Sequence, residues 1–394
     1  MDKRRNHTRS ASKQKKETHI TSQKNGSKKR KIGHIDYTFL TLVIIIVCTG
    51  LIMLFSASAP AANRKFDNSY HFFIRQLLFA CAGFIFMIFI SRIDYRKYKK
   101  YTKKLMLICI VMLILVFFPT IGVELNGSRR WINLGVMNFQ PSELMKPTIA
   151  MFFAAEIESK RHKLTNINGL KFYLFWLGVT AGLLMLETHL SGTIIICGIA
   201  AVVMIVGGLN MKYVIGCGLV AVPAGTLFVM TDKVRRARVL NFMNPFEDVK
   251  MTGYQVVQGL YAIGSGGFFG LGLGNSIQKF TYLPEPYNDF IFAVICEELG
   301  FIGALFIISL FVLLVFRGVK IALNAPDVFG MLTVVGIMAQ IGIQTAFNIA
   351  VVTSSIPNTG VTLPFFSYGG TAMMVLLAEM GVVLNISRYS KVTE

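Results

Sequence analysis

Charged residues are scarce in this sequence, and several patterns found in soluble or catalytic domains are missing. Asp, Glu, Lys and Arg account for 15% of the 394 residues, whereas soluble domains average about 25%. None of the six cysteines is in a CxxC spacing and all lie in apolar segments, so we interpret them as small packing residues rather than as metal ligands or disulfide partners. No internal repeat supports a repeat-built transporter. With 54% hydrophobic residues, the composition indicates a membrane protein.

The net charge of +20 is concentrated near the N-terminus. Residues 1–35 contain twelve lysines and arginines but only two acidic residues and few apolar ones, which predicts a disordered basic tail. A basic tail can bind nucleic acid, but directly before an apolar segment it is better explained as a cytoplasmic anchor drawn to anionic lipid. We therefore expect no nucleic-acid partner. No cleavable signal peptide is predicted, because the first apolar run begins near Thr38 and is as long as a full span.

Apolar runs long enough to cross a bilayer recur along the rest of the chain, so we expect an all-α polytopic membrane protein. About ten spans are predicted, and nine or eleven remain possible because the third, fourth and tenth runs are short or interrupted. The runs are 37–57, 72–91, 104–120, 142–157, 170–187, 191–209, 212–231, 288–316, 328–352 and 368–387. Basic residues gather in the connections 92–104, 158–171 and 317–327, which places both termini in the cytoplasm.

A large extracellular loop, residues 232–288, is predicted between spans seven and eight. Loops of this length are usually functional or disordered, and the alternation of basic, aromatic and glycine segments argues against disorder. An apolar stretch from Val256 to Leu273 is too rich in glycine to span, so it lies at the interface or re-enters the membrane under cover of protein. Glycine-rich loops can cradle phosphate, but no Lys-Ser/Thr follows this one, so it is not a P-loop.

Ionisable residues at membrane depth are functional candidates because burying them is costly. Pro141 begins a helix, and Glu143 and Lys146 can pair within its first turns. The alternative is a capped span with a neutralised pair. Just before this helix, Arg129 and Arg130 beside Trp131 suit an anionic headgroup or a diphosphate, or serve as interfacial anchors. In the long loop, a second basic cluster comprises Arg235, Arg236 and Arg238.

Asp289 lies where the long loop enters span eight. A carboxylate there is partly desolvated but reachable from outside, which suits a general base; a helix N-cap is the alternative, and both can hold. Glu297 and Glu298 follow about two turns deeper, and one of them could reach the same side of the helix. Small residues from Ser367 to Thr371 would allow close approach of a helix or a ligand.

Five short motifs follow one another along the chain: Gly-Ser-Arg-Arg-Trp at 127–131, Gln-Pro-Ser-Glu at 140–143, Ala-Ile-Gly-Ser-Gly-Gly at 262–267, Asp-Phe-Ile-Phe-Ala at 289–293 and Pro-Phe-Phe-Ser-Tyr-Gly-Gly at 364–370. In this order they resemble the SEDS family, the FtsW/RodA/SpoVE proteins, and most closely its FtsW/SpoVE branch. The resemblance makes residues 36–390 a SEDS-like transmembrane domain in a bacterial cytoplasmic membrane. It implies an inverting peptidoglycan glycosyltransferase that polymerises lipid II at the outer face during cell division or sporulation.

The resemblance also implies roles for individual residues. Asp289 matches the family's essential carboxylate and would deprotonate the acceptor hydroxyl. The implied substrate-binding residues are Arg129, Arg130, Trp131, Glu143, Lys146, Arg235, Arg236, Arg238, Gln255, Lys279, Glu285 and Ser367. No metal-ligand cluster is predicted, and Mg²⁺ or Mn²⁺ is retained only as an optional aid at the diphosphate. The implied partners are a class B penicillin-binding protein, which supplies transpeptidase chemistry, and other division or sporulation membrane proteins.

Two positions depart from the family pattern. Tyr287 stands where many members have histidine, and His189 stands where many have an aspartate after span five, so roles carried over to these positions are in doubt. Two other functions remain open. A lipid II flippase would have polar groups distributed through the membrane depth, and Glu297, Glu298 and Glu379 are the residues that keep this alternative open. A non-catalytic scaffold of the division machinery would not need Asp289.

Overall fold

A computed structural model of the protein describes residues 33–390, except 126–127, 134, 136, 161–163, 165–166, 232–235, 237–238, 240–241, 244 and 247–252. The predicted tail therefore lies almost wholly outside the described residues. The long helices are α1 (Tyr37–Phe66), α2 (His71–Arg92), α3 (Arg96–Leu115), α4 (Pro141–Ser159), α5 (Ile167–Leu186), α6 (Leu190–Val206), α7 (Met211–Thr231), α11 (Ile291–Leu323), α12 (Val328–Val352) and α13 (Gly370–Ser387).

These ten helices coincide with the ten predicted apolar runs, and the chain is an all-α polytopic membrane protein. Among the described residues, α1, α2, α5, α11, α12 and α13 are long and apolar enough to span a membrane by themselves, while α6 is apolar but shorter. In contrast, α3 begins with a run of basic residues, and α4 buries Glu143, Lys146 and Glu156. The number of ten spans therefore stays a prediction.

Burial separates a core from a periphery. Two thirds of the apolar window of α12 and of α13 is buried, compared with about one fifth for α2 and α5 (67% and 22%). The α12 helix packs against α4, α6 and α11, and α13 packs along α2.

Side-chain caps fix the starts of two helices. Asp36 caps α1 by accepting from Phe39 N (2.9 Å), and Asp327 caps α12 by accepting from Gly330 N (2.8 Å).

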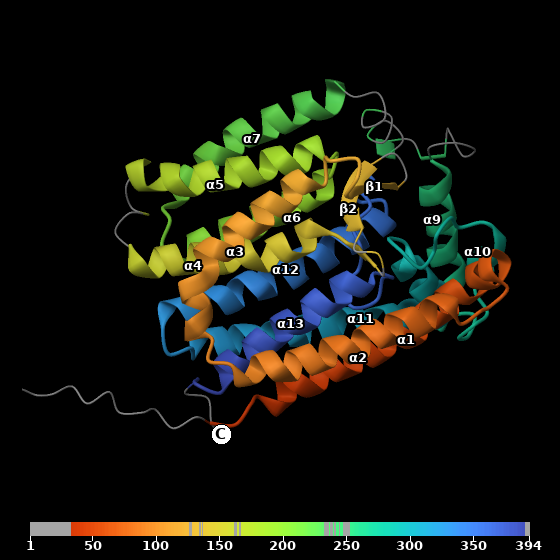
Figure 1. The fold of residues 1–394 in the computed structure, drawn as a ribbon. Coiled ribbons are helices and arrows are strands. Elements are labelled where there is room, and N and C mark those ends of the chain that lie inside the picture. Colours follow the sequence, from red (N-terminus) through yellow and green to blue (C-terminus); the bar gives the residue numbers. More distant parts are fainter. Residues whose placement is uncertain are drawn as a thin grey trace, which may run out of the picture. The chain divides into compact units, whose positions relative to one another are not determined.

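The connections hold structure that hydropathy did not predict. Between α3 and α4, the strands β1 (Gly122–Leu125), β2 (Ser128–Asn133) and β3 (Asn138–Phe139) form a small antiparallel sheet in that order. The long loop contains α9 (Tyr254–Gly266), which packs on α11, and the short α10 (Gln278–Thr281). Figure 1 shows β1, β2, α9 and α10 together at one end of the long helices. That end carries the candidate site.

Candidate functional site

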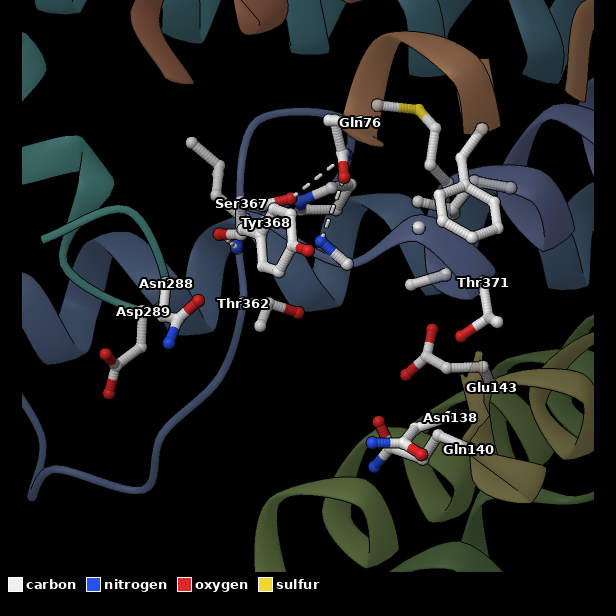
Figure 2. A pocket seen from close by; sticks show the side chains of 18 of the residues that line it. Gln76, Asn138, Gln140, Glu143, Asn288, Asp289, Thr362, Ser367, Tyr368 and Thr371 are labelled. Atoms are coloured by element: carbon white, nitrogen blue, oxygen red, sulfur yellow. Dashed lines mark hydrogen bonds between the residues drawn. The ribbon is translucent and has the colours of Figure 1, made fainter. Parts of the chain in front are cut away.

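A cavity of about 1030 Å³ opens at this end of the bundle. Its walls come from the first three turns of α2, the β2–α4 segment, the start of α6, the loop before α11 and the segment 360–376, together with Lys65 of α1 and Gln344 of α12. Seven of the predicted site residues line it: Arg130, Trp131, Glu143, Lys146, Glu285, Asp289 and Ser367. Figure 2 shows Asp289 on one side of the space and Glu143 on the other. The fold therefore brings together groups from four separate parts of the sequence.

The α4 side of the cavity carries a buried ion pair. The Lys146 ammonium donates to Glu143 Oε2 at 2.8 Å and to Gln344 Oε1 at 3.0 Å, and both charged residues are buried. The Gln344 amide in turn donates to the carbonyl and the hydroxyl of Thr362 (3.0 and 3.1 Å). This neutralised pair matches one of the alternatives that the sequence left open, and it also faces the cavity. The substrate-binding role of Lys146 stays a prediction.

Asp289 lies on the opposite side, two residues before α11 begins. The N-cap of α11 is Phe290, which makes no side-chain capping bond, so the alternative that Asp289 caps this helix is wrong. Its backbone is anchored from α12: the Asn348 amide donates to the carbonyls of Asp289 and Val361, both at 2.7 Å. Gln255 at the start of α9 donates to Asp289 Oδ1 at 3.5 Å. The half-buried carboxylate is thus held at the cavity wall.

An aromatic cluster closes the wall between Asp289 and α2. The Tyr287 ring stacks on Phe72 with 4.6 Å between centroids, and Tyr368 meets Phe72 edge-on at 5.0 Å. Burial raises the pKa of the Tyr287 phenol to about 12, so this hydroxyl stays protonated at neutral pH. Tyrosine therefore provides packing here and has no group that ionises near neutral pH.

The segment before α13 is folded back by side-chain hydrogen bonds. Gln76 of α2 accepts from Gly369 N (3.1 Å) and donates to Ser367 O (3.5 Å), as Figure 2 shows. The Ser367 hydroxyl oxygen accepts from Leu363 N at 2.8 Å. Ser367 therefore lines the cavity while its hydroxyl closes a turn, which makes it part of the wall architecture.

The turn between α5 and α6 contributes His189. Arg130 reaches this turn and donates to Thr188 O at 2.6 Å and to Glu187 O at 3.4 Å. Burial, followed by the positive charges of Arg130 and Lys146, lowers the pKa of His189 to about 3. His189 is therefore a neutral imidazole in the cavity wall, where the family pattern has a carboxylate. Gly192 lies directly under its ring, and any Cβ there would overlap it.

Other predicted site residues lie away from the cavity. Arg129 pairs with Glu124 across β1 and β2 (3.0 Å). Lys279 is buried in a second ion pair, with Glu298 at 2.5 Å, and also donates to Ser56 Oγ at 3.0 Å. Arg236 is exposed and does not line the cavity, and Gln255 stands behind Asp289. The remaining two members of the basic cluster, Arg235 and Arg238, lie outside the described residues.

The glycine-rich loop pairs with a break in α11. Gly300 has φ +68°, so the helix is interrupted there, and its free backbone groups bond to the loop. Leu271 N and Gly272 N donate to the carbonyls of Glu297 and Glu298 (both 3.0 Å), and Phe301 N donates to Gly267 O (2.9 Å). Because α11 engages the amides of Leu271 and Gly272, we interpret the loop as a structural brace rather than a phosphate cradle.

The carboxylates of Glu297 and Glu298 are also committed to this brace. Glu297 accepts from Ile277 N at 2.9 Å and from the Ser276 hydroxyl, while Glu298 pairs with Lys279. Neither carboxylate lines the cavity that Asp289 lines, so the expectation that one of them could reach the same side of the helix as Asp289 stays a prediction.

The sequence reasoning missed several polar residues around the cavity. Arg75, Gln76 and Gln344 line it, and Asn348 anchors Asp289. The last three are uncharged amides inside apolar runs, and a search for charged residues alone passes over them. Polar amides in spans would have been the signal. Among the described residues, no group of three or more His, Cys, Asp or Glu side chains is placed to hold a metal ion.

Known proteins resemble nearly the whole chain. A family model described as "Cell cycle protein", covering FtsW, RodA and SpoVE, matches residues 36–392. Stage V sporulation protein E of Bacillus subtilis (strain 168) is 42% identical over 359 residues, covering 90% of this chain and 98% of that protein. A probable peptidoglycan glycosyltransferase FtsW of Geobacter sulfurreducens is 40% identical over 360 residues, covering 91% and 96%.

Solved structures give the same picture. A chain from a peptidoglycan synthase complex, described as coordinating polymerization and crosslinking, matches with a TM-score of 0.76 at 27% identity and covers 90% of this chain and 98% of its own. The rod shape determining protein RodA of Thermus thermophilus matches with a TM-score of 0.68 at 26% identity, covering 91% and 98%.

Proposed function

The chain belongs to the FtsW/RodA/SpoVE family of cell cycle proteins, and from this premise we propose that it is a peptidoglycan glycosyltransferase. It polymerises lipid II into glycan strands at the outer face of the bacterial cytoplasmic membrane, during cell division or sporulation. The observation that carries the proposal is one cavity that holds a carboxylate, Asp289, together with buried or half-buried cations, Lys146 and Arg130. The concentration of basic residues in the connections at the other end of the helices supports the outer location.

The reaction requires a base and a place for negative charge. The acceptor sugar's 4-hydroxyl loses its proton as its oxygen attacks the anomeric carbon of the lipid-linked donor, and the bond from that carbon to the diphosphate breaks with inversion. We assign Asp289 as the general base, because its carboxylate lines the cavity and its backbone is fixed by Asn348. A base held in place by the fold loses little entropy on reaching the reactive geometry.

The leaving diphosphate gains negative charge as the bond breaks. Lys146 and Arg130 line the cavity, and Lys146 pairs with Glu143, which Figure 2 shows across the space from Asp289. This arrangement supports their assignment as electrostatic stabilisers of that charge. Neither cation is loose before substrate arrives: Lys146 is paired with Glu143, and Arg130 donates to the 187–188 backbone. Pre-organised donors of this kind need little rearrangement during the reaction.

A flippase receives less support than an enzyme. The acidic residues that favoured transport are committed elsewhere: Glu297 and Glu298 belong to the brace, and Glu379 accepts from Gln340 at 3.1 Å between α12 and α13. None of these three lines the cavity. The partner we propose is a class B penicillin-binding protein, since the similar synthase complex combines polymerization with crosslinking and this chain has no serine nucleophile motif.

The experiment is lipid II polymerisation by the chain co-purified with its class B penicillin-binding protein. We expect Asp289→Asn to lose at least about 100-fold in rate, because positioned general bases contribute about 10²–10⁴. Asp67→Asn is the matched control: Asp67 is an exposed C-cap of α1 with φ 53°, a conformation that Asn also tolerates. A rate for Asp289→Asn equal to that of the control would remove Asp289 as the base.

A further inference from the structure

Asp289 stands at the end of a chain of amide hydrogen bonds that the reaction as described does not use. The Gly360 N–H donates to Asn358 Oδ1 (3.0 Å), Asn358 Nδ2 donates to Gln255 Oε1 (3.2 Å), and Gln255 Nε2 donates to Asp289 Oδ1 (3.5 Å). The chain therefore connects the segment before α13 to the start of α9 and to the loop before α11. Three elements meet at one carboxylate.

The direction of this chain is fixed by its first member. A backbone N–H can only donate, so the Asn358 oxygen must face Gly360 and the Asn358 amino group must face Gln255. The Gln255 oxygen is then occupied, and its amino group has to point toward Asp289. The polarity does not depend on how either amide is assigned, although such assignments are ordinarily ambiguous.

A second amide fixes the backbone of the same residue. Asn348 is fully buried in α12 and donates to the carbonyls of Asp289 and Val361. Carbonyl oxygens can only accept, so this orientation is also unambiguous. The Asn348 amide thus fixes the backbone of Asp289, and the Gln255 amide fixes the direction of its carboxylate. Gly360 borders the same carboxylate, and a Cβ there would lie 3.8 Å from Asp289 Oδ2.

We propose that Gln255 and Asn358 are positioning residues that orient the Asp289 carboxylate toward the acceptor hydroxyl. The inference rests on the proposed function, in which Asp289 is the base. An N–H donor on Oδ1 stabilises the ionised carboxylate, and Oδ2 lies on the side of Gly360, which lines the cavity. Gln255 contributes by acting on Asp289 and does not itself line the cavity.

Two variants test the relay without removing the base. Gln255→Glu places a second carboxylate beside Asp289, which disfavours its ionisation, so the acidic limb of the kcat–pH profile should move up by about 1–2 pH units. Asn358→Asp keeps the oxygen that Gly360 N–H needs but removes the amino group. Gln255 must then turn its own amino group toward the carboxylate introduced at position 358 and its oxygen toward Asp289. We expect kcat to fall about tenfold with little change in KM, from loss of a hydrogen bond to a charged group.

The profile is informative because the other charged groups of the cavity are unchanged in both variants. They are Lys65, Arg75, Arg130, Glu143, Lys146 and Glu285. His189 and Tyr287 do not titrate near neutral pH, because burial holds the pKa of the imidazole at about 3 and that of the phenol at about 12. The matched control is Asn210→Asp, on an exposed turn at the opposite end of α6, where Oδ1 still accepts from Lys212 N.

The measurement is steady-state lipid II polymerisation by the co-purified complex between about pH 5 and pH 9. The relay is supported if the acidic limb of the kcat–pH profile moves to higher pH in Gln255→Glu and kcat falls in Asn358→Asp, while Asn210→Asp behaves like wild type. An unmoved limb in an active Gln255→Glu overturns it, and so do Asn358→Asp kinetics equal to those of Asn210→Asp. If Gln255→Glu has no activity at any pH, the Asn358→Asp kinetics decide. Full activity in Asp289→Asn would instead overturn the proposed function.

Discussion

Replacing Lys146 should affect stability and catalysis in ways that can be separated. Lys146 as a whole is 3% exposed, and its ammonium bonds both Glu143 and Gln344. Lys146→Met would leave the Glu143 carboxylate buried without its counter-charge, and removing one partner of a buried ion pair costs about 3–5 kcal/mol of unfolding free energy. Glu143→Gln should cost a similar amount. The double variant should recover most of that loss, because a buried pair replaced by neutral groups of similar volume is often neutral.

The same three variants separate folding from chemistry. If Lys146 stabilises the leaving diphosphate, the double variant remains at least about 100-fold slower than wild type even though it folds, since one pre-organised donor is worth about 10²–10³ in rate. Unfolding would be followed in detergent micelles titrated with sodium dodecyl sulfate, and polymerisation would be measured with lipid II. A double variant as unstable as either single variant would refute the neutralised pair. A stable double variant with wild-type activity would refute the role at the diphosphate.

The brace between the glycine-rich loop and α11 yields two further predictions. Gly270 has φ +79°, and a Cβ on it would overlap the Glu298 carbonyl. Gly270→Ala should therefore lower the unfolding midpoint far more than the control Gly178→Ala, whose Cβ would meet no neighbouring atom within 4 Å. Equal midpoints for the two variants would contradict the brace. Lys279→Met should destabilise by about 3–5 kcal/mol, with recovery when Glu298→Gln is added. Polymerisation by that recovered double variant should be close to wild type, and a large loss would place Lys279 at the substrate after all.

The apolar runs predict the helices well because each long helix has to satisfy its own backbone in lipid. The apolar runs therefore predicted the positions of the long helices. The polar residues at the ends of these runs predicted which end of the bundle carries the candidate site. Asp289 was found because a carboxylate at the mouth of a span is exceptional. The same logic selected Lys279, which the structure places in an ion pair with Glu298 away from the cavity, because a buried structural lysine and a ligand-binding lysine have the same sequence signal.

The parts that the sequence could not predict depend on partners distant in the chain. Gln255 and Asn358 are 103 residues apart and meet only in the folded protein. The glycines at 267–274 suggested phosphate, but the amides of Leu271 and Gly272 donate to the carbonyls of Glu297 and Glu298 beside the break at Gly300. Asn348 lies in an apolar helix, where nothing local distinguishes an amide that anchors the Asp289 backbone from one that packs between helices.

The central claim is that Asp289 removes the acceptor proton in a cavity whose opposite side holds the diphosphate. The most direct measurement is the initial rate of lipid II polymerisation by the co-purified complex carrying Asp289→Asn, compared with Asp67→Asn in the same preparation. We predict a loss of at least about 100-fold for Asp289→Asn and a wild-type rate for the control. A wild-type rate for Asp289→Asn would contradict the account.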